Sequence, residues 1–476
     1  MSIRNEGKEN KICGRICVEV KARLDSPLSI GSGNDEHTDS DVLVTAAGEP
    51  FIPGSALAGV FRSYLRTQLG DEQAGDLFGN LGREKRKGGK DGDVPERDER
   101  QSRIFIYDAL VENPVIMMRD GVKLNERKAS EYQSKYQVQT VERGAQVKLR
   151  LELLERKADL NQSEETDLEK VWRRDLEWIE TLLFGLSEGE LRVGSKSRRG
   201  FGKIKVLEAK AKCFDLTAPE EYLEWLDWDW DRPEAFARSQ QLEFKTNKRR
   251  TEHCLRVPLQ LEGTILIREY TGTFAGEYSC RQMTVGNEGK QAVIPGSTWA
   301  GAVRSQTAKL VKEIVRLNSW EKAQEKLEPF FGPWKADDGK KEGMYASKLV
   351  FEESLIHGGC ELPATRIAVD RLTGGVAVGA VFNEKIWAGG DTELVIRWPD
   401  QSDSDVICGL LLLAVADLKS GFLPVGGETA VGRGIFTGAA QKPVLLDGCE
   451  LKQTELYTRA AMEWMDSLGR KYDDRR

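Results

Sequence analysis

The sequence predicts an α+β protein made of two tandem modules that share one order of strands and helices. Three observations support this fold class. Sequence blocks recur in the same order in both halves of the chain, each half opens on an alternating apolar strand, and each repeated proline–glycine turn precedes apolar residues at helical spacing. A chain of 476 residues is also long enough for two domains of ordinary size.

The clearest repeat surrounds a proline–glycine turn. IPGSALAGVFRS, which begins at Ile52, matches IPGSTWAGAVRS, which begins at Ile294, without a gap at an offset of 242 (294 − 52). The segments that begin at Ser102 and Gly144 match segments lying 245 residues later (347 − 102 and 389 − 144). The glycine-rich segments RVGSKSRRGFG and PVGGETAVGRG follow at an offset of 232 (432 − 200). The constant order and the similar offsets indicate an internal duplication.

The first module is predicted to begin with a strand over 15–25, where apolar residues alternate, and the second opens in the same way at Val257. Ser55 and Ser297 resemble helix N-caps, because each follows a Pro-Gly turn and precedes a helical pattern. The SRIFIYDA and SKLVFEES blocks then predict second strands, and the segments after Gly144 and Gly389 predict third strands. Second helices are expected at about 168–184 and 405–419, and final strands at 201–206 and 434–437. This order is the ferredoxin-like arrangement.

The predicted domain boundaries place the first module at 1–210 and the second at 256–476, the latter with a C-terminal helical tail. Residues 211–255 form a linker rich in tryptophan and acidic residues, with Trp225, Trp228 and Trp230 among carboxylates. Either these tryptophans pack against one module or they form a docking patch for a neighbouring subunit.

Composition narrows the function classes. Hydrophobic residues at 39% and charged residues at 31% describe a soluble protein with no apolar run long enough for a membrane span, and the charged N-terminus lacks a secretory signal. We therefore expect a cytoplasmic protein. The scattered cysteines do not have zinc-site spacing. A net charge of −7 argues against a simple basic nucleic-acid binder, so any RNA contact must be local. Basic clusters lie at 83–90, 194–200 and 245–250, although such runs are most often only solvated loop surface.

These motifs resemble those of the RAMP superfamily, and within it the Cas-seven-type backbone subunits of type III CRISPR complexes. The resemblance rests on IGSG (30–33) with TDSDVLV and GEPFIPGSALAGVFRSYL, on SRIFIYDA, on IPGSTWAGAVRS with TRIAVDRLTGGVAVGAVFNEKIWAGG, and on the two glycine-rich segments. The tandem arrangement is similar to double-module subunits of III-D-like systems. Both modules are covered by these motifs.

The resemblance implies two RRM-like RAMP modules, each with a β-hairpin thumb, at about 110–142 and 355–388, and a C-terminal glycine-rich loop. It also implies three kinds of partner: a CRISPR guide RNA, a complementary target RNA, and the other subunits of a multisubunit type III effector complex. No membrane partner is expected.

Several residues are predicted to contact RNA. Ser55 and Ser297 stand where a helix N-terminus offers backbone N–H groups to a phosphate, and Arg62 and Arg304 lie about two turns farther on, where each either binds the sugar-phosphate backbone or pairs with an acid. The first glycine-rich loop concentrates Lys196, Arg198 and Arg199, whereas its counterpart holds only Arg433; alternatively, the glycines only permit a tight connection.

Asp39 in HTDSD is the predicted catalytic residue, because it matches the family's active-site aspartate by its position before the IPGS turn. The resemblance implies that Asp39 holds a magnesium or manganese ion for target-RNA cleavage, with Asp41, Asp35 and His37 nearby. At an offset of 242, Arg281 replaces Asp39, so the second module is predicted to grip phosphate rather than cleave, unless Glu277 substitutes. Asp370 is expected to fix a turn in the second thumb.

Three functions remain open at this point. The chain is a metal-dependent target-RNA endonuclease, a structural guide-binding subunit without chemistry, or a guide-processing ribonuclease. The last normally uses a histidine acid–base site, for which the chain offers His37, His253 and His357.

Overall fold

The computed structural model describes residues 11–31, 41–80, 101–126, 130–157, 167–244, 251–269, 277–284, 289–334 and 345–473. These residues form two compact units. Unit 1 takes the described residues within Met1–Met117, Gln139–Ser195 and Gly202–Arg249, and unit 2 takes those within Met118–Val138, Lys196–Phe201 and Arg250–Arg476. Two pieces of the first half of the chain, 118–138 and 196–201, therefore pack in unit 2 together with the second half.

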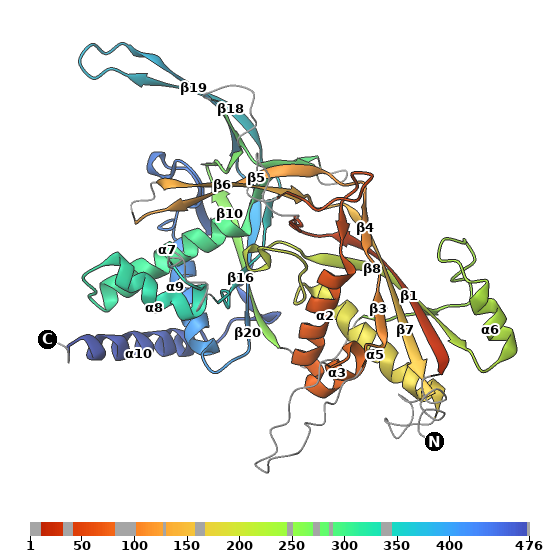
Figure 1. The fold of residues 1–476 in the computed structure, drawn as a ribbon. Helices are drawn as coiled ribbons and strands as arrows, with labels where there is room; N and C mark the ends of the chain where they lie inside the picture. The colour runs from red at the N-terminus through yellow and green to blue at the C-terminus, as the bar shows by residue number, and fades with distance from the viewer. Residues whose placement is uncertain are drawn as a thin grey trace, which may run out of the picture. The chain divides into compact units, whose positions relative to one another are not determined.

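Unit 1 is built on an antiparallel sheet with β1 (Ile12–Leu24) at its centre (Figure 1). Strand β1 pairs with β7 (Gln146–Arg156) on one side and with β8 (Ile204–Asp215) on the other. Strand β7 pairs in turn with β3 (Ile104–Ile106) and β4 (Ala109–Glu112). The short β2 (Phe51–Ile52) and β9 (Gln240–Gln241) extend the edges, and the helices are α2 (Gly54–Leu69), α3 (Asp71–Phe78) and α5 (Leu168–Glu188). The order β8-β1-β7-β3 is that of a ferredoxin-like sheet.

Unit 2 repeats this sheet. Strand β10 (Glu252–Glu262) lies between β20 (Asp391–Pro399) and β21 (Ile435–Gly438), and β20 pairs with β16 (Val350–Phe351). All these pairs are antiparallel, so both predicted ferredoxin-like modules are confirmed. The remaining elements near this sheet are α7 (Gly296–Ile314), α8 (Trp320–Phe331), α9 (Ser404–Lys419), α10 (Thr454–Asp473), β22 (Leu445–Leu446) and β23 (Cys449–Glu450).

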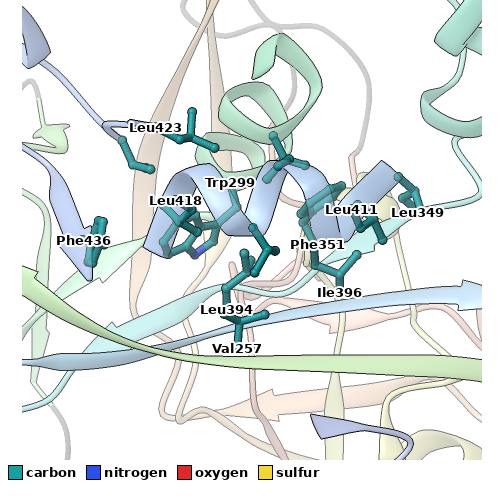
Figure 2. Close-up of a cluster of buried hydrophobic side chains, with 14 of the residues drawn as sticks. Val257, Trp299, Leu349, Phe351, Leu394, Ile396, Leu411, Leu418, Leu423 and Phe436 are labelled. Carbon is teal, nitrogen blue, oxygen red and sulfur yellow. The ribbon is translucent and has the colours of Figure 1, made fainter. Parts of the chain in front are cut away.

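The core of unit 2 lies between its sheet and helices α7 and α9. Figure 2 shows Trp299 of α7 and Leu418 of α9 above Leu394 of β20 and Val257 of β10, and all four side chains are buried. Apolar burial of this kind supplies most of the stability of a small module. Helix α10 packs closely on α9, because a Cβ atom at Gly409 would clash with the Tyr457 carbonyl oxygen.

A long hairpin is inserted in each module at the predicted thumb position. The first consists of β5 (Ile116–Leu124) and β6 (Ser130–Val141), and the second of β18 (Cys360–Val369) and β19 (Val376–Ala388). At the tip of the second thumb, the Leu372 side chain is 95% exposed. Three short strands share a sheet with the second thumb: β11 (Thr264–Ile265), β12 (Arg268–Glu269) and β13 (Glu277–Cys280). Three others form a separate sheet: β14 (Gln282–Thr284), β15 (Lys290–Ile294) and β17 (Ser354–Ile356).

The start of helices α2 and α7 differs from the prediction. The N-cap residues are Pro53 and Pro295, so the prediction that Ser55 and Ser297 cap these helices was wrong. Each proline holds an extended conformation, with φ of −59° or −60°, and the helix begins at the glycine that follows. Both serines are therefore already helical and exposed, one residue inside the first turn.

The tryptophan-rich segment is folded onto unit 1. After β8 the chain forms α6 (Pro219–Leu226), and Trp228 then packs edge-on against Phe214 with ring centroids 5.2 Å apart. Trp230 packs against Tyr107 at 5.9 Å. These contacts favour the interpretation that the tryptophans pack against a module. Within the described residues, no helix combines the length and the apolar character needed to cross a membrane.

Candidate nucleic-acid interface

The two glycine-rich loops have the same backbone conformation. In the first glycine loop (194–202), Lys196 and Gly200 are left-handed with φ of 57° and 91°, and they flank a single 3-10 turn, Ser197–Arg199. In the second glycine loop (426–434), Glu428 and Gly432 have φ of 57° and 85° around Thr429–Val431. Glycine adopts this conformation without steric cost, which explains why both loops keep it at the end of the turn. The matching backbone conformations confirm that the two loops are equivalent at an offset of 232.

The basic side chains of the first glycine loop gather on one tyrosine of the first thumb. The Lys196 ammonium lies 4.6 Å from the centroid of the Tyr136 ring, and the Arg199 guanidinium donates a hydrogen bond of 2.9 Å to the Tyr136 hydroxyl. Arg198 is half-buried in the same turn, and Arg199 is exposed. Three cations and one aromatic ring thus share a small area of unit 2.

The same loop lies against the start of helix α7. A Cβ atom at Gly296 would lie 2.5 Å from the Arg199 carbonyl oxygen, and one at Gly200 would lie 2.5 Å from the Phe351 carbonyl oxygen. Close backbone packing therefore requires glycine at both positions. It brings the exposed Ser297 into the same region as the basic loop. We call Tyr136, Lys196, Arg198, Arg199 and Ser297 the junction surface.

The first thumb is also held to the second module by side chains. Arg119 of β5 forms a buried ion pair of 2.5 Å with Glu353, and Glu126 pairs with Lys312 of α7 at 2.7 Å. These pairs connect the thumb to the two segments against which the first glycine loop also packs. The junction surface is consequently supported by β5, β6, η1 (Ser197–Arg199) and α7 together.

The junction surface has the chemistry of a phosphate-binding surface. The first turn of a helix carries unsatisfied N–H groups and a partial positive charge, which favour an anion. The adjacent lysine and arginines add full positive charges. A tyrosine ring offers a face on which a base can stack. None of these contacts reads base edges, so binding here would tolerate any sequence.

Helix α2 of unit 1 presents a second candidate surface. Ser55, Gly59 and Arg62 are exposed and follow one another at helical spacing on one face. The Arg62 guanidinium makes a long hydrogen bond of 3.4 Å to the Asn80 side chain. Among the described residues, nothing lies within 4 Å of a Cβ atom placed at Gly59, and the same holds at Gly301, its counterpart in α7. Glycine inside a helix costs about 1 kcal/mol relative to alanine. No contact in the described part of the chain therefore requires this glycine, which suits close approach by an external backbone.

Arg304, the counterpart of Arg62, has a different environment. Its guanidinium donates a hydrogen bond of 2.7 Å to Gln324, lies 5.5 Å from the centroid of the Trp334 ring and also contacts Phe331. Burial lowers the pKa of Arg304 to about 10. Its side chain thus joins α7 to α8 rather than projecting from the helix as Arg62 does.

Arg281 and Arg433 are likewise engaged by protein groups. Arg281 is 5% exposed, and its guanidinium lies between the Glu269 carboxylate and the Met118 carbonyl oxygen. Arg433 is 6% exposed and pairs with Glu384 at 2.7 Å and with Glu428 at 2.6 Å. Burial alone would raise the pKa of Glu384, but hydrogen bonds from Arg366 and Arg433 hold that pKa below its ordinary value. These contacts occupy the guanidinium of Arg281, which the sequence analysis assigns to phosphate, and also that of Arg433, the one cation of the second glycine loop.

Asp39 lies outside the described residues, as do Asp35 and His37, but both ends of its loop are placed. A bridge joins Gly31 to Val42, and the Val42 N–H donates a hydrogen bond of 3.2 Å to the side chain of Gln139, at the root of the first thumb. Ser29, just before the loop, accepts a hydrogen bond of 2.7 Å from the Ser195 N–H of the first glycine loop. The predicted catalytic loop therefore starts and ends where the thumb root meets the glycine loop.

The residue types in and before this loop carry oxygen atoms of the kinds that bind a hard divalent cation. Asp39 and Asp41 supply carboxylate oxygens in the sequence of this loop, and the hydroxyls of Ser29 and Ser195, before its placed start, lie 2.9 Å apart. Magnesium and manganese prefer such oxygen ligands. In the described ranges, no group of three or more His, Cys, Asp or Glu side chains is arranged to hold a metal.

The remaining candidates have structural contacts. Asp370 accepts hydrogen bonds from the Leu372 and Thr373 N–H groups at the tip of the second thumb, and these bonds lower its pKa. This is the turn-fixing role expected of it. His253 contacts Asp447 at 2.9 Å and Asp400 at 3.3 Å, and the backbone of His357 bridges to Asp391. The Glu277 side chain lies outside the described residues.

Two residues of the interface were missed in the sequence. Tyr136 lies in a thumb strand without a distinctive motif, and Arg119 is one of many charged residues in the same hairpin. Their importance comes from contacts with Arg199 and Glu353, which are distant along the chain. The alternating pattern of the thumb could have identified Tyr136 as a surface residue but not its partners.

The family match agrees with the fold. The RAMP superfamily matches residues 21–205 and 281–437, which together make up more than half of the chain and include parts of both modules. No curated protein matches. A solved structure, described as the type III-B Cmr-beta bound to cognate target RNA, is similar at 17% identity with a TM-score of 0.30. That match covers 44% of this chain and 64% of the other, so the chain spans less than two thirds of that relative's length. The family match shows that this chain belongs to the RAMP superfamily.

Proposed function

We propose that this chain is a guide-RNA-binding backbone subunit of a type III CRISPR effector complex, and that its first module cleaves complementary target RNA. Its partners would be the CRISPR guide RNA, the target RNA and the other subunits of that complex. Membership of the RAMP superfamily and the motifs in both modules support this role. The observation that carries it is the junction surface, where three cations, Tyr136 and the start of α7 converge.

Guide binding would use both candidate surfaces. At the junction surface, Lys196, Arg198 and Arg199 would neutralise phosphates while Ser297 offers a hydroxyl at a helix N-terminus. On α2, Arg62 would contact the RNA backbone, which could approach the helix closely at Gly59 because this position has no side chain. Contacts of this kind read the sugar-phosphate chain, as a subunit that accepts arbitrary guide sequences requires.

Cleavage would rest on Asp39. We propose that Asp39, with Asp41 beside it, holds a magnesium or manganese ion that would neutralise phosphate charge and activate the attacking oxygen. The placed ends of its loop support this assignment, because Val42 is hydrogen-bonded to Gln139 at the thumb root and Ser29 accepts a hydrogen bond from Ser195 of the first glycine loop. A purely structural subunit without chemistry is the alternative, and Asp39 distinguishes the two.

The second module would bind without cleaving. The segment that corresponds to the Asp39 loop contains strands β13 and β14, and between them Arg281 is enclosed by Glu269 and Met118. A guanidinium cannot hold a divalent cation. We therefore expect one cut in the target for each copy of this subunit, opposite the first module.

RNA binding can be tested at the junction surface directly. The triple variant Lys196→Ala, Arg198→Ala, Arg199→Ala should bind single-stranded RNA more weakly, and the slope of log affinity against log salt should fall by about 2, because each lost phosphate contact contributes about 0.7 for a single strand. The matched control changes three exposed basic residues near or in helix α10, Lys452, Arg459 and Arg470, to alanine. Equal loss of affinity in both variants would show a general charge effect and would reject the junction surface. Circular dichroism and thermal unfolding check that each variant is folded.

A further inference from the structure

The unit 1 sheet is covered by helices on one face and by the tryptophan-rich segment on the other. Along β1, Ile16 and Val18 point into the helix-covered core, so the alternate residues point to the opposite side. Cys17 lies on that opposite side, as does Phe214 of β8, and both are nevertheless buried. Residues 219–236 provide this cover. We call the strand residues on the side without the core helices the outer face.

The outer face carries the kinds of side chain that bind a single strand of RNA. Its charged residues lie in rows across β7, β1 and β8, and the cations are Arg15, Lys21, Lys148, Arg150, Lys210 and Lys212. The carboxylates in the same rows are Glu19, Glu152 and Glu208, so positive charge predominates. Aromatic rings flank the rows at Phe105, Tyr107 and Phe214. Cations for phosphates, together with rings on which bases stack, are the usual means of binding a single strand.

The segment 219–236 places a tryptophan ring on each of three cations of the outer face. The pairs, with the distance from the cation to the ring centroid, are Trp225 with Arg15 at 4.3 Å, Trp228 with Lys212 at 5.3 Å, and Trp230 with Arg150 at 5.4 Å. Trp228 also packs edge-on against Phe214. The rings therefore occupy the positions at which RNA bases would stack.

Carboxylates of the same segment pair with two of these cations. Glu224 pairs with Lys212, and Asp231 pairs with Arg150. In the run DWDWD at 227–231, carboxylates and aromatic rings alternate residue by residue. Phosphates and bases alternate in the same way along a nucleic-acid strand. The segment thus presents to the outer face the two chemical groups that a single strand would present.

The cover is shallow. Helix α6 has no buried residue, and the three tryptophans are only half-buried. The indole N–H of Trp228 is enclosed, yet among the described residues it has no hydrogen-bond acceptor. Ion pairs near the surface contribute little to stability. A ligand that supplies both phosphates and bases can therefore compete with this segment for the outer face.

We propose that the outer face is a second binding site for single-stranded RNA, and that residues 219–236 occupy it as an intramolecular mimic of the strand. Bound RNA displaces the segment, so phosphates replace its carboxylates and bases replace its rings. Competition with the segment lowers the apparent affinity of the site, because only the uncovered fraction of the molecules can bind. This site is distinct from the junction surface and from α2, and the inference does not depend on the proposed function.

The test uses the full-length protein in a background that lacks the other two candidate surfaces, made by Lys196→Ala, Arg198→Ala, Arg199→Ala and Arg62→Ala. The open variant adds four substitutions at contacts with the outer face: Glu224→Gln, Trp225→Ala, Trp230→Ala and Asp231→Asn. Trp228 is kept because it covers Phe214. Fluorescence anisotropy of a labelled oligouridine measures affinity. The open variant should bind about tenfold more tightly than the background protein, because its outer face is uncovered.

The matched control removes two carboxylates and two apolar side chains from the same segment without touching the outer-face pairs. Its substitutions are Leu223→Ala, Leu226→Ala, Asp227→Asn and Asp229→Asn. The two leucines are exposed, and both aspartates pair with Arg232 inside the segment. This control should stay within about twofold of the background affinity.

A third protein locates the site. Adding Arg150→Ala and Lys212→Ala to the open variant should abolish the gain in affinity, because these cations would contact the phosphates. A gain that persists without them would place the RNA on another surface and overturn the proposal. Unchanged affinity in the open variant would show that the segment is only structural. An equal gain in the matched control would show a general effect of charge.

Circular dichroism checks that each variant is folded. If the open variant does not fold, the pair Glu224→Gln and Asp231→Asn is compared with the pair Asp227→Asn and Asp229→Asn, which changes the charge equally. We expect a gain of about threefold in the first pair alone, since exposed ion pairs are weak. Equal affinities in the two pairs would overturn the proposal.

Discussion

Arg62 and Arg304 occupy equivalent places in the two repeats but serve different purposes in the structure. Arg62 is exposed on α2, whereas Arg304 is enclosed by Gln324, Phe331 and Trp334. The difference arises from α8 and the turn after it, whose aromatic residues cover one arginine. A repeat in sequence therefore does not ensure a repeat in function at the level of a single side chain.

This difference predicts opposite effects for two matched variants. Arg304→Ala should lower the free energy of unfolding by about 2 kcal/mol, because it removes buried hydrogen bonds and ring contacts, and should leave RNA affinity unchanged. Arg62→Ala should leave stability within about 0.5 kcal/mol and lower RNA affinity by up to about tenfold. Urea unfolding and filter binding on the two proteins measure both quantities. A loss of RNA affinity in Arg304→Ala at unchanged stability would contradict this account.

The sequence could not distinguish these environments. Arg304 and Arg281 follow motifs in which their partners do not appear, because Phe331, Trp334 and Met118 become neighbours only through the fold. Lys196, Arg198 and Arg199 could be identified, because a basic run between glycines is visible in the sequence itself. The assignment of Asp39 remains a prediction, since Asp39 lies outside the described residues.

At the scale of elements, predictions from periodicity succeeded where a strand or helix buries one face. The strand expected over 15–25 is β1, and the helices expected at 168–184 and 405–419 are α5 and α9. The predicted serine caps failed, because proline ends the extended segment one residue before the glycine and the helix starts there. Local chemistry at a helix end depends on the backbone conformation of one residue, which hydrophobic periodicity does not report.

The sheet of unit 2 contains a pH-dependent contact. The hydrogen bond with Asp447 raises the pKa of His253 above its ordinary value, although burial opposes this shift. A raised pKa means that the contribution to stability is fully present below the unfolded-state pKa of about 6.5 and is lost as pH rises through the folded-state pKa. The stability of this unit should therefore decrease between about pH 6 and pH 8.

His253→Gln is the control for that prediction, because glutamine does not titrate in this range. The urea midpoint of the wild type should fall as pH rises, and the decrease should be smaller in His253→Gln. Parallel pH profiles for the two proteins would show that the His253–Asp447 contact is not the cause. Far-UV circular dichroism provides the measurement.

At the scale of the whole molecule, the duplication was evident from the sequence and its consequences were not. Nearly constant offsets predicted two ferredoxin-like modules. The offsets could be found because the glycines at left-handed positions and the prolines at turns recur in the sequence itself. The pieces 118–138 and 196–201 nevertheless pack in unit 2. Such packing depends on close approach at Gly200 and Gly296 and on the Arg119–Glu353 pair, which no periodic pattern encodes.

Under the proposed function, the duplication would separate two roles that a single module would combine. The first module has Asp39 and the basic glycine loop. In the second module, Arg281 is enclosed by protein groups, and Arg433 of the glycine loop pairs with Glu384 and Glu428. The central claim is therefore that one of two homologous modules cuts RNA while both bind it.

Mapping of the cut sites in a complementary target RNA tests this claim most directly. The assembled complex is compared for wild type, Asp39→Ala and Glu277→Ala, with magnesium or manganese present, using a target labelled at either end. We predict one cut attributable to this subunit, lost in Asp39→Ala with target binding nearly unchanged, and retained in Glu277→Ala. Undiminished cleavage in Asp39→Ala, or a second product that disappears only in Glu277→Ala, would contradict the account.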